Sequence, residues 1–169
     1  MIINRKFARA SHATFTIPPI KDLLKKYNVG IGWVDPFAGY NSPAEWTNDL
    51  DDNAPTKAHL EADKFCMELG VFLPLKGVLF DPPYSYRQIS EHYKAFKKKA
   101  TALDTSYNFY GRVMDAITPK MPLKSLAISF GWNSNGFGKK RGFEIEEILL
   151  VAHGLHHNDT ICTVERKVR

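Results

Sequence analysis

The stretch Gly77–Tyr84 constrains the fold of this chain more than any other part of the sequence. Its first four residues form a short apolar run, which is typical of a buried strand, and the run stops at the carboxylate of Asp81. Pro82 and Pro83 follow, and because each proline fixes φ and lacks an N–H, the sheet cannot continue through them. The pattern therefore predicts a strand that ends in an acid, a stiff turn and an aromatic ring, Tyr84. That edge is where open α/β sheets bind their ligands.

A second run of the same kind comes earlier in the chain. Residues Val29–Val34 are expected to form a buried strand, and an acid, a proline and a glycine follow it. Gly39 has no Cβ, so the backbone can take a positive φ there and approach a ligand closely. Trp46 then starts a brief strand that runs into carboxylates. Asp49 is the one expected to meet a ribose, because one carboxylate can accept hydrogen bonds from both hydroxyls.

Together these segments resemble the amino methyltransferases, and most of all the adenine-N6 DNA methyltransferases that carry the motif Asp-Pro-Pro-Tyr, including the small phage-type enzymes. The resemblance implies that Asp81 and the carbonyl of Pro82 hold the exocyclic amine of a flipped base while Tyr84 stacks on its ring. An aromatic amine is a poor nucleophile, and two acceptors on its hydrogens aim the nitrogen lone pair at the methyl group. The implied catalytic residues are Asp81, Pro82, Pro83 and Tyr84. The alternative is a plain Pro-Pro turn before a helix.

The same resemblance implies S-adenosylmethionine as the cofactor. Its methionine end would lie against the loop after the first strand, its ribose on Asp49, and its adenine near Leu50 and Glu61. The cofactor-binding residues expected from the family are Asp35, Pro36, Phe37, Ala38, Gly39, Asp49, Leu50, Glu61 and Ala62. Asn41 stands where the family has a second glycine, and the segment after it is too short for a full helix. The first crossover helix is therefore expected to be stunted.

The segment Ala54–Leu69 allows two interpretations. Its apolar residues recur with helical spacing, which favours one amphipathic helix. The family resemblance favours a short strand over Ala58–Leu60, a loop at Glu61 and Ala62, and a helix capped by Asp63. We prefer the second interpretation because it supplies the third strand of the family's sheet.

A glycine-rich, basic and aromatic loop, Gly131–Gly142, follows the strand expected over Leu123–Phe130. A loop of this composition at the end of a strand is expected to face the substrate. Its aromatic side chains could stack on a base and its cations could meet phosphates. The substrate-binding residues expected here are Trp132, Phe137, Lys139, Lys140 and Arg141.

The remaining elements complete the order of a class I methyltransferase. A capping helix starts near Pro19, helices are expected from Tyr86 and over Tyr107–Ile117, and the chain closes with a hairpin of Phe143–Val151 and Thr160–Arg166. The fold class implied is α/β, a Rossmann-like, mostly parallel seven-stranded sheet with an antiparallel C-terminal hairpin. We expect a single catalytic domain over residues 1–169, without a separate target-recognition domain. The histidines of the hairpin turn favour a polar turn over a zinc site, so no metal is expected.

The net charge and the composition of the chain indicate which binding partners and which cellular compartment to expect. The formal net charge of +5 suits a polyanion, so we expect a nucleic acid, DNA above all, with a homodimer or a recognition partner as a further source of specificity. The sequence has neither an apolar run of membrane length nor a signal peptide, and its two cysteines favour reduced core thiols in the cytoplasm of a bacterium or a phage-infected cell.

The alternatives to an adenine-N6 DNA methyltransferase are an RNA adenine-N6 or a cytosine-N4 methyltransferase, methylation of a protein glutamine or a small amine, and a non-catalytic nucleic-acid-binding subunit of the same fold.

Overall fold

The computed structural model describes residues 1–70, 75–83, 107–154 and 157–169. Tyr84 and the helix expected from Tyr86 lie outside the described residues. The strands are β1 (Ile2–Phe7), β2 (Trp33–Asp35), β3 (Trp46–Thr47), β4 (Gly77–Phe80), β5 (Leu126–Gly131), β6 (Phe143–Ala152) and β7 (Thr160–Lys167). The helices are α1 (Pro18–Lys26), α2 (Ala62–Glu68) and α4 (Tyr107–Ile117), with 3₁₀ turns η1 (Thr14–Thr16), η2 (Thr118–Lys120) and η3 (Lys139–Arg141).

In the described part of the chain, seven strands form one sheet in the order β1-β6-β7-β5-β4-β2-β3. Strand β7 runs antiparallel to both of its neighbours, and the other strand pairs are parallel. The predicted mostly parallel sheet with an antiparallel C-terminal hairpin is therefore confirmed. Strands β2, β3, β4 and β5 all end at the same side of the sheet, which we call the carboxyl edge, and start at the opposite side, the amino edge.

The sheet has seven strands, as expected, but one predicted strand is missing and one strand that was not predicted is present. The predicted strand over Ala58–Leu60 is reduced to a single bridge between Asn48 and Ala58. The missing place is taken at the other end of the sheet by β1, which pairs with β6 from Ile2 to Phe7. Every residue of β1 is exposed, so its sequence has no buried face that would predict a strand.

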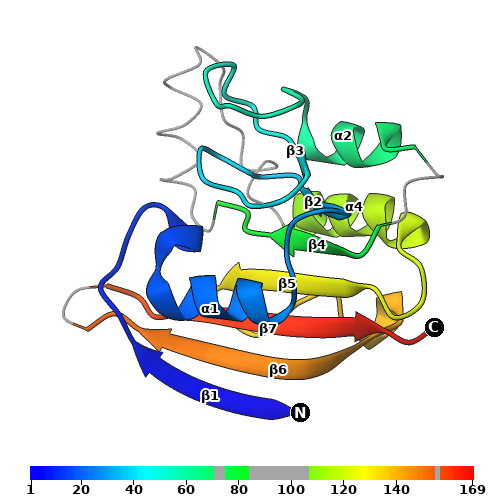
Figure 1. The fold of residues 1–169 in the computed structure, drawn as a ribbon. Helices are drawn as coiled ribbons and strands as arrows, with labels where there is room; N and C mark the ends of the chain where they lie inside the picture. Colours follow the sequence, from blue (N-terminus) through cyan, green and yellow to red (C-terminus); the bar gives the residue numbers. More distant parts are fainter. Residues whose placement is uncertain (71–74, 84–106, 155–156) are drawn as a thin grey trace.

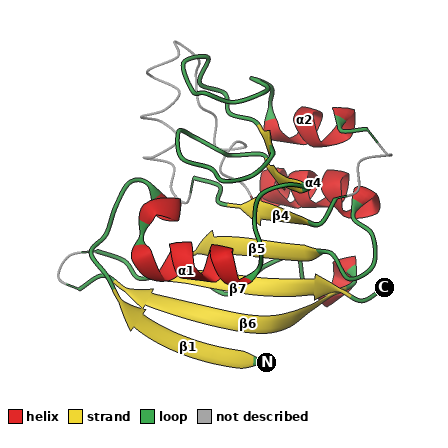
Figure 2. Ribbon diagram, in the orientation of Figure 1, coloured by secondary structure: helices red, strands yellow, loops and turns green. Residues whose placement is uncertain are grey.

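Helix α1 covers one face of the sheet, and α2 and α4 cover the other (Figures 1 and 2). The prolines of α1 occupy its first turn, where a missing N–H costs nothing, and Lys25 and Lys26 lie in its last turn, as predicted. Its apolar stripe, Ile20, Leu23 and Leu24, is buried against the sheet. The two layers fix the positions of the loops at the carboxyl edge.

Two glycine-dependent features shape the strands that carry the site. Strand β2 starts at Trp33, later than predicted, because Gly30 and Gly32 have φ values of 154° and 84° that break the extended chain. Strand β4 starts at Gly77, where a Cβ would lie 2.6 Å from the Trp33 ring. Only a glycine allows these two strands to pair at that point. Both cysteines, Cys66 and Cys162, are buried free thiols, as predicted.

Candidate active site

The carboxyl edge brings together the acids that follow β2, β3 and β4. Strand β2 pairs in parallel with both β3 and β4, so Asp35, Asp49 and Asp81 end neighbouring strands of one sheet. Burial above all, and to a smaller extent the negative charges of Asp81 and Asp49, raise the pKa of Asp35. The sequence placed each of these acids at the end of a strand.

Asp35 is the inner member of this group and is completely buried. Its Oδ1 accepts a hydrogen bond from the Phe37 N–H at 3.0 Å, and its Oδ2 accepts one from the Ser42 hydroxyl at 2.6 Å. Burial raises the pKa of Asp35 to about 7, although these two hydrogen bonds act to lower it. Asp35 therefore fixes the start of the loop after β2 from the inside.

Gly39 and Asp49 form the outer part of the same loop. Gly39 has a φ of 53°, and its N–H donates to Asp49 Oδ2 at 2.9 Å, while the Asp51 N–H donates to Asp49 Oδ1 at 2.9 Å. No described atom lies within 4 Å of the point where a Cβ of residue 39 would stand. The backbone at Gly39 is therefore open to a ligand. The Asp49 carboxylate lies next to it and is held in place by two N–H groups. Leu50 is half-buried next to it.

Asn48 holds this loop to the next segment and was not predicted. It is buried, its Nδ2 donates to the carbonyls of Pro36 at 3.1 Å and Leu60 at 2.9 Å, and its Oδ1 accepts from the Leu60 N–H at 2.9 Å. The Asn48 carbonyl also accepts from the Ala38 N–H at 2.9 Å. The available signal was a polar residue directly after a very short strand, between that strand and the acid.

The segment predicted to follow the third strand departs from the expectation. Helix α2 begins at Ala62, one residue before the predicted cap, so Asp63 lies inside the first turn and the prediction that it caps the helix is wrong. Glu61 precedes the helix, is exposed and pairs with Lys64 at 3.2 Å. Ala62 is buried in the core. Asp63 instead pairs with Arg112 of α4 at 3.4 Å and joins the two helices.

The side chain of Phe37 points into the protein. Its ring centroid lies 5.5 Å from that of Phe80 and 6.4 Å from those of Phe109 and Tyr110, all at edge-to-face angles. The loop Asp35–Gly39 is therefore anchored by a half-buried ring that packs on the core. As predicted, the connection to β3 is stunted: residues 36–45, all of which the structure describes, form turns and no helix.

Asp81, Pro82 and Pro83 leave β4 at the centre of the carboxyl edge. Asp81 is half-buried and Pro82 is buried, while the carbonyl of Pro83 accepts a hydrogen bond from the Tyr110 hydroxyl. Tyr110, from α4, thus fixes the proline turn, a role that the sequence did not reveal. Tyr84, the fourth predicted catalytic residue, lies outside the described residues.

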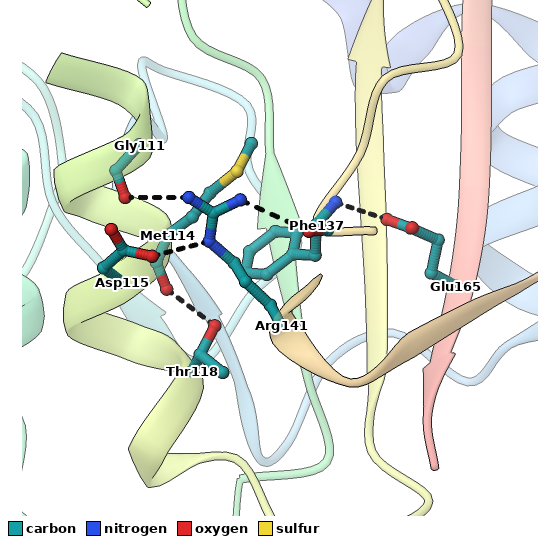
Figure 3. Close-up of polar contacts among 7 residues, drawn as sticks. All are labelled: Gly111, Met114, Asp115, Thr118, Phe137, Arg141 and Glu165. Atoms are coloured by element: carbon teal, nitrogen blue, oxygen red, sulfur yellow. Dashed lines mark hydrogen bonds and ion pairs between the residues drawn. The ribbon is translucent and has the colours of Figure 1, made fainter. Parts of the chain in front are cut away.

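Phe137 does not lie where the sequence predicted. Its side chain is 1% exposed and packs between the rings of Phe80 and Phe143, so the prediction that it contacts a base is wrong. Glu165 of β7 holds the backbone at this point, because its carboxylate accepts from the N–H group of Phe137 at 2.6 Å (Figure 3) and from that of Gly138 at 2.8 Å. Burial raises the pKa of Glu165 despite both hydrogen bonds. A Cβ at Gly136 would lie against this carboxylate, so a larger residue there would displace the Glu165 side chain.

The basic end of the same loop lies at the wrong edge for the predicted contact. Strand β6 runs in the same direction as β5, so the loop must cross from the carboxyl edge at Gly131 to the amino edge at Phe143. Arg141 binds there to Asp115 at 2.7 Å and to the carbonyl of Phe137 at 3.3 Å (Figure 3). Lys139 and Lys140 are exposed beside it, away from the candidate site, whereas Trp132 stays at the carboxyl edge and is 49% exposed.

The described residues were also considered for a metal site and for helices that could span a membrane. Among the residues that the structure describes, no three His, Cys, Asp or Glu side chains gather in a way that could hold a metal ion. His153 of the hairpin turn contacts the Ala8 carbonyl at 2.9 Å and the Thr160 hydroxyl at 2.8 Å through its two ring nitrogens. None of the described helices has the length and apolar character to cross a membrane.

Comparison with known proteins gives no match to a protein-family model and none to a curated sequence. Among solved structures, TrmN from Thermus thermophilus matches with a TM-score of 0.55 and 15% identity, over 90% of this chain and 49% of that one. This chain thus spans about half the length of the Thermus protein.

Two other solved structures match over similar lengths. A candidate methylase from Haemophilus influenzae has a TM-score of 0.50 and 10% identity, over 90% of this chain and 88% of that chain. The 1,6-didemethyltoxoflavin-N1-methyltransferase from Burkholderia thailandensis, solved with 1,6-didemethyltoxoflavin and S-adenosylhomocysteine, has a TM-score of 0.58 and 11% identity, over 90% and 77% of the two chains. At such identities the likeness concerns the fold, and it confirms the Rossmann-like fold of class I methyltransferases.

Proposed function

We propose that this chain transfers a methyl group from S-adenosylmethionine to the exocyclic N6 amine of adenine in DNA. The observation that carries the proposal is the place of Asp81 and Pro82. They follow strand β4, which lies between β5 and β2, and the open loop at Gly39 follows the neighbouring strand β2. The acceptors and the cofactor loop are thus on adjacent strand ends.

The residues present fit the cofactor. The open space over Gly39 suits close approach of the methionine end, and Asp49 presents a carboxylate whose remaining lone pairs can accept from ribose hydroxyls. Glu61 is exposed near the start of α2 and is available for the adenine amino group. When bound, S-adenosylmethionine supplies an electrophilic methyl group.

In this proposal Asp81 and the Pro82 carbonyl act on the substrate. Both accept hydrogen bonds from the amine, which holds the nitrogen with its lone pair directed at the incoming carbon. As the new N–C bond would form and the methyl–sulfur bond would break, positive charge would develop on the nitrogen, where the Asp81 carboxylate would stabilise it, and loss of an amine proton would give the neutral methylamine product. Tyr110 supports this step indirectly, because its hydroxyl holds the carbonyl of Pro83 and thereby the turn.

Nucleic acid is the proposed substrate class, since the half-exposed Trp132 lies at the same edge as Asp81 and offers a face on which a base can stack. The choice of DNA and of adenine follows the likeness of the Asp81–Tyr84 motif to adenine-N6 enzymes. An enzyme of this kind would work in the cytoplasm of a bacterium or a phage-infected cell, alone, as a dimer or with a recognition partner.

The test is methyl transfer by Asp81→Ala, with Asp52→Ala, an exposed aspartate of the next loop, as the matched control. Labelled methyl is followed from S-adenosylmethionine onto a duplex DNA, its single strand, the same sequence as RNA, and DNA without adenine. We expect Asp81→Ala to lose roughly 10²–10³-fold or more of the rate, with unchanged cofactor affinity by calorimetry. Wild-type transfer by Asp81→Ala would refute the mechanism, and transfer to adenine-free DNA would move the assignment to cytosine.

A further inference from the structure

A cavity of about 420 Å³ opens at the amino edge of the sheet, opposite the candidate active site. Asp115 and Thr118, at the end of α4 and the start of η2, form one wall, and Lys140, Arg141 and Arg169 form the other. Strand β5 has six residues, so the cavity lies about 20 Å from the carboxyl edge. None of the interactions described for the candidate active site involves these residues.

The inner wall of the cavity is rigid. Arg141 is held by Asp115 at 2.7 Å, by the carbonyl of Phe137 at 3.3 Å and by the carbonyl of Gly111 at 3.5 Å (Figure 3). The turn η3 that carries it starts after Gly138 and ends at Gly142, whose φ values of 74° and 85° few other residues adopt. The basic side chains are therefore presented by a fixed turn and not by a free loop.

The rim of the cavity carries an excess of positive charge. Lys139 and Lys140 are exposed, and the Arg169 guanidinium is held beside them because its Nη2 donates to the Lys139 carbonyl at 2.7 Å. Nearby, Lys167 Nζ donates to the carbonyl of Thr118, one of the residues that line the cavity, at 2.7 Å. Among the described residues that line the cavity, Asp115 has the single acidic side chain, and Arg141 pairs with it.

We propose that this basic rim binds the phosphates of a nucleic-acid backbone, at a surface separate from the place where the base is held. Exposed lysines around a fixed arginine suit sequence-independent phosphate contacts, which position a nucleic acid without reading it. A nucleic acid that reaches both edges must follow the protein for about 20 Å, less than one turn of duplex. The identity of the ligand rests on the proposed function, whereas the phosphate-binding surface does not.

The experiment measures binding of a fluorescent duplex of about three turns by anisotropy at several salt concentrations. Every protein carries Asp81→Ala and no cofactor is added, so the result does not depend on whether methyl transfer occurs. The test variant is Lys139→Gln/Lys140→Gln/Arg169→Gln, which spares the structural Arg141. The matched control, Lys6→Gln/Lys21→Gln/Lys25→Gln, removes the same charge from exposed positions on β1 and α1.

We expect the test variant to bind at least roughly 10-fold more weakly and to lose up to about 2.7 units of salt slope, since each of three phosphate contacts contributes about 0.9. The control should change affinity less than about 3-fold, and the melting temperatures of both should match the parent. Equal losses in the two triple variants would overturn the proposal, because net charge alone would then explain binding. Binding of inorganic triphosphate without binding of the duplex would also overturn it. If the triple variant does not fold, Lys140→Glu alone provides the same comparison.

Discussion

The two halves of the sheet are stabilised in different ways. Strands β2, β3 and β4, which carry the candidate site, have only three, two and four residues, whereas β5, β7 and β6 have six, eight and ten. The long strands are held by long backbone ladders, with one irregularity between Ile145 and Glu147 of β6. The short ones depend on single polar side chains, above all Asp35, Asn48 and Asp49, that bind loop backbone.

This difference has a physical cause and a consequence. The N–H and C=O groups of a loop are not paired with a neighbouring strand, so those that are buried need a hydrogen bond from a side chain. Removal of that side chain leaves the buried backbone group unpaired. Substitution of a polar side chain beside the short strands β2, β3 and β4 should therefore lower the free energy of unfolding strongly. A comparable substitution in the long strands β5, β6 and β7 should lower it little. Four predictions follow that order of size.

Asn48→Ala should lower the free energy of unfolding by about 3 kcal/mol, because it leaves the Pro36 carbonyl and both backbone groups of Leu60 without partners. Chemical denaturation measures the change. Asn53→Ala is the matched control, since Asn53 is an exposed asparagine of the following loop, and it should cost less than about 0.5 kcal/mol. Similar values for the two variants would show that the short half does not depend on this residue.

Asp49→Ala should weaken S-adenosylmethionine binding by roughly 1–3 kcal/mol, or about 5–150-fold, because ribose hydroxyls would lose their acceptor. Asp51→Ala is the comparison, since Asp51 binds Tyr40 at 2.7 Å and has no proposed cofactor contact. Isothermal calorimetry of both variants decides the matter. Equal affinities would remove Asp49 from the site.

Asp35→Asn should change how stability depends on pH. The folded chain holds the Asp35 proton more tightly than the unfolded chain, since burial raises its pKa from 3.8 to about 7. Its contribution is therefore complete below about pH 4 and is lost as the pH rises toward 7. Denaturation at pH 5, 6 and 7 should show wild type losing about 1 kcal/mol per pH unit relative to Asp35→Asn. A constant difference would mean that Asp35 is ionised throughout.

Thr163→Val should be neutral or stabilising by up to about 1 kcal/mol. The Thr163 hydroxyl is buried in the long half and has no hydrogen-bond partner in the described structure, so its removal relieves a desolvation cost. Thermal and chemical denaturation measure the change. A decrease of more than about 1 kcal/mol in the free energy of unfolding would contradict the contrast between the two halves. It would mean that the long strands also depend on a polar side chain.

The parts of the site that sequence predicted are those with local causes. An apolar run that stops at Asp35 or Asp81 before a proline defines a strand end wherever the strand is placed, and parallel pairing then brings these ends together. The burial of Phe137 could not be predicted, since its ring packs against that of Phe80, which is far away along the chain. The crossing of the loop to the amino edge depends equally on where Phe143 pairs, with Lys167.

Asn48 escaped prediction for a different reason. An asparagine after a short strand has the same sequence signature whether it is a solvent-exposed turn residue or a buried acceptor and donor for two loops. The distinction lies in its distance to Pro36 and Leu60, each twelve residues away along the chain. Local pattern therefore predicts where functional side chains start, and long-range pairing decides which of them stay exposed.

The pairing of β1 with β6 has a consequence for folding of the chain during its synthesis. Ile2 pairs with Glu147 and Phe7 with Ala152, so β1 is synthesised long before its partner strand β6. Contacts so far apart in sequence form slowly, since a very long loop must close first. During that time Ile3 and Phe7, which stay 66% and 72% exposed even in the folded protein, form an unpaired strand that can join another chain. Arg5 and Lys6 between them supply the charge that opposes such aggregation.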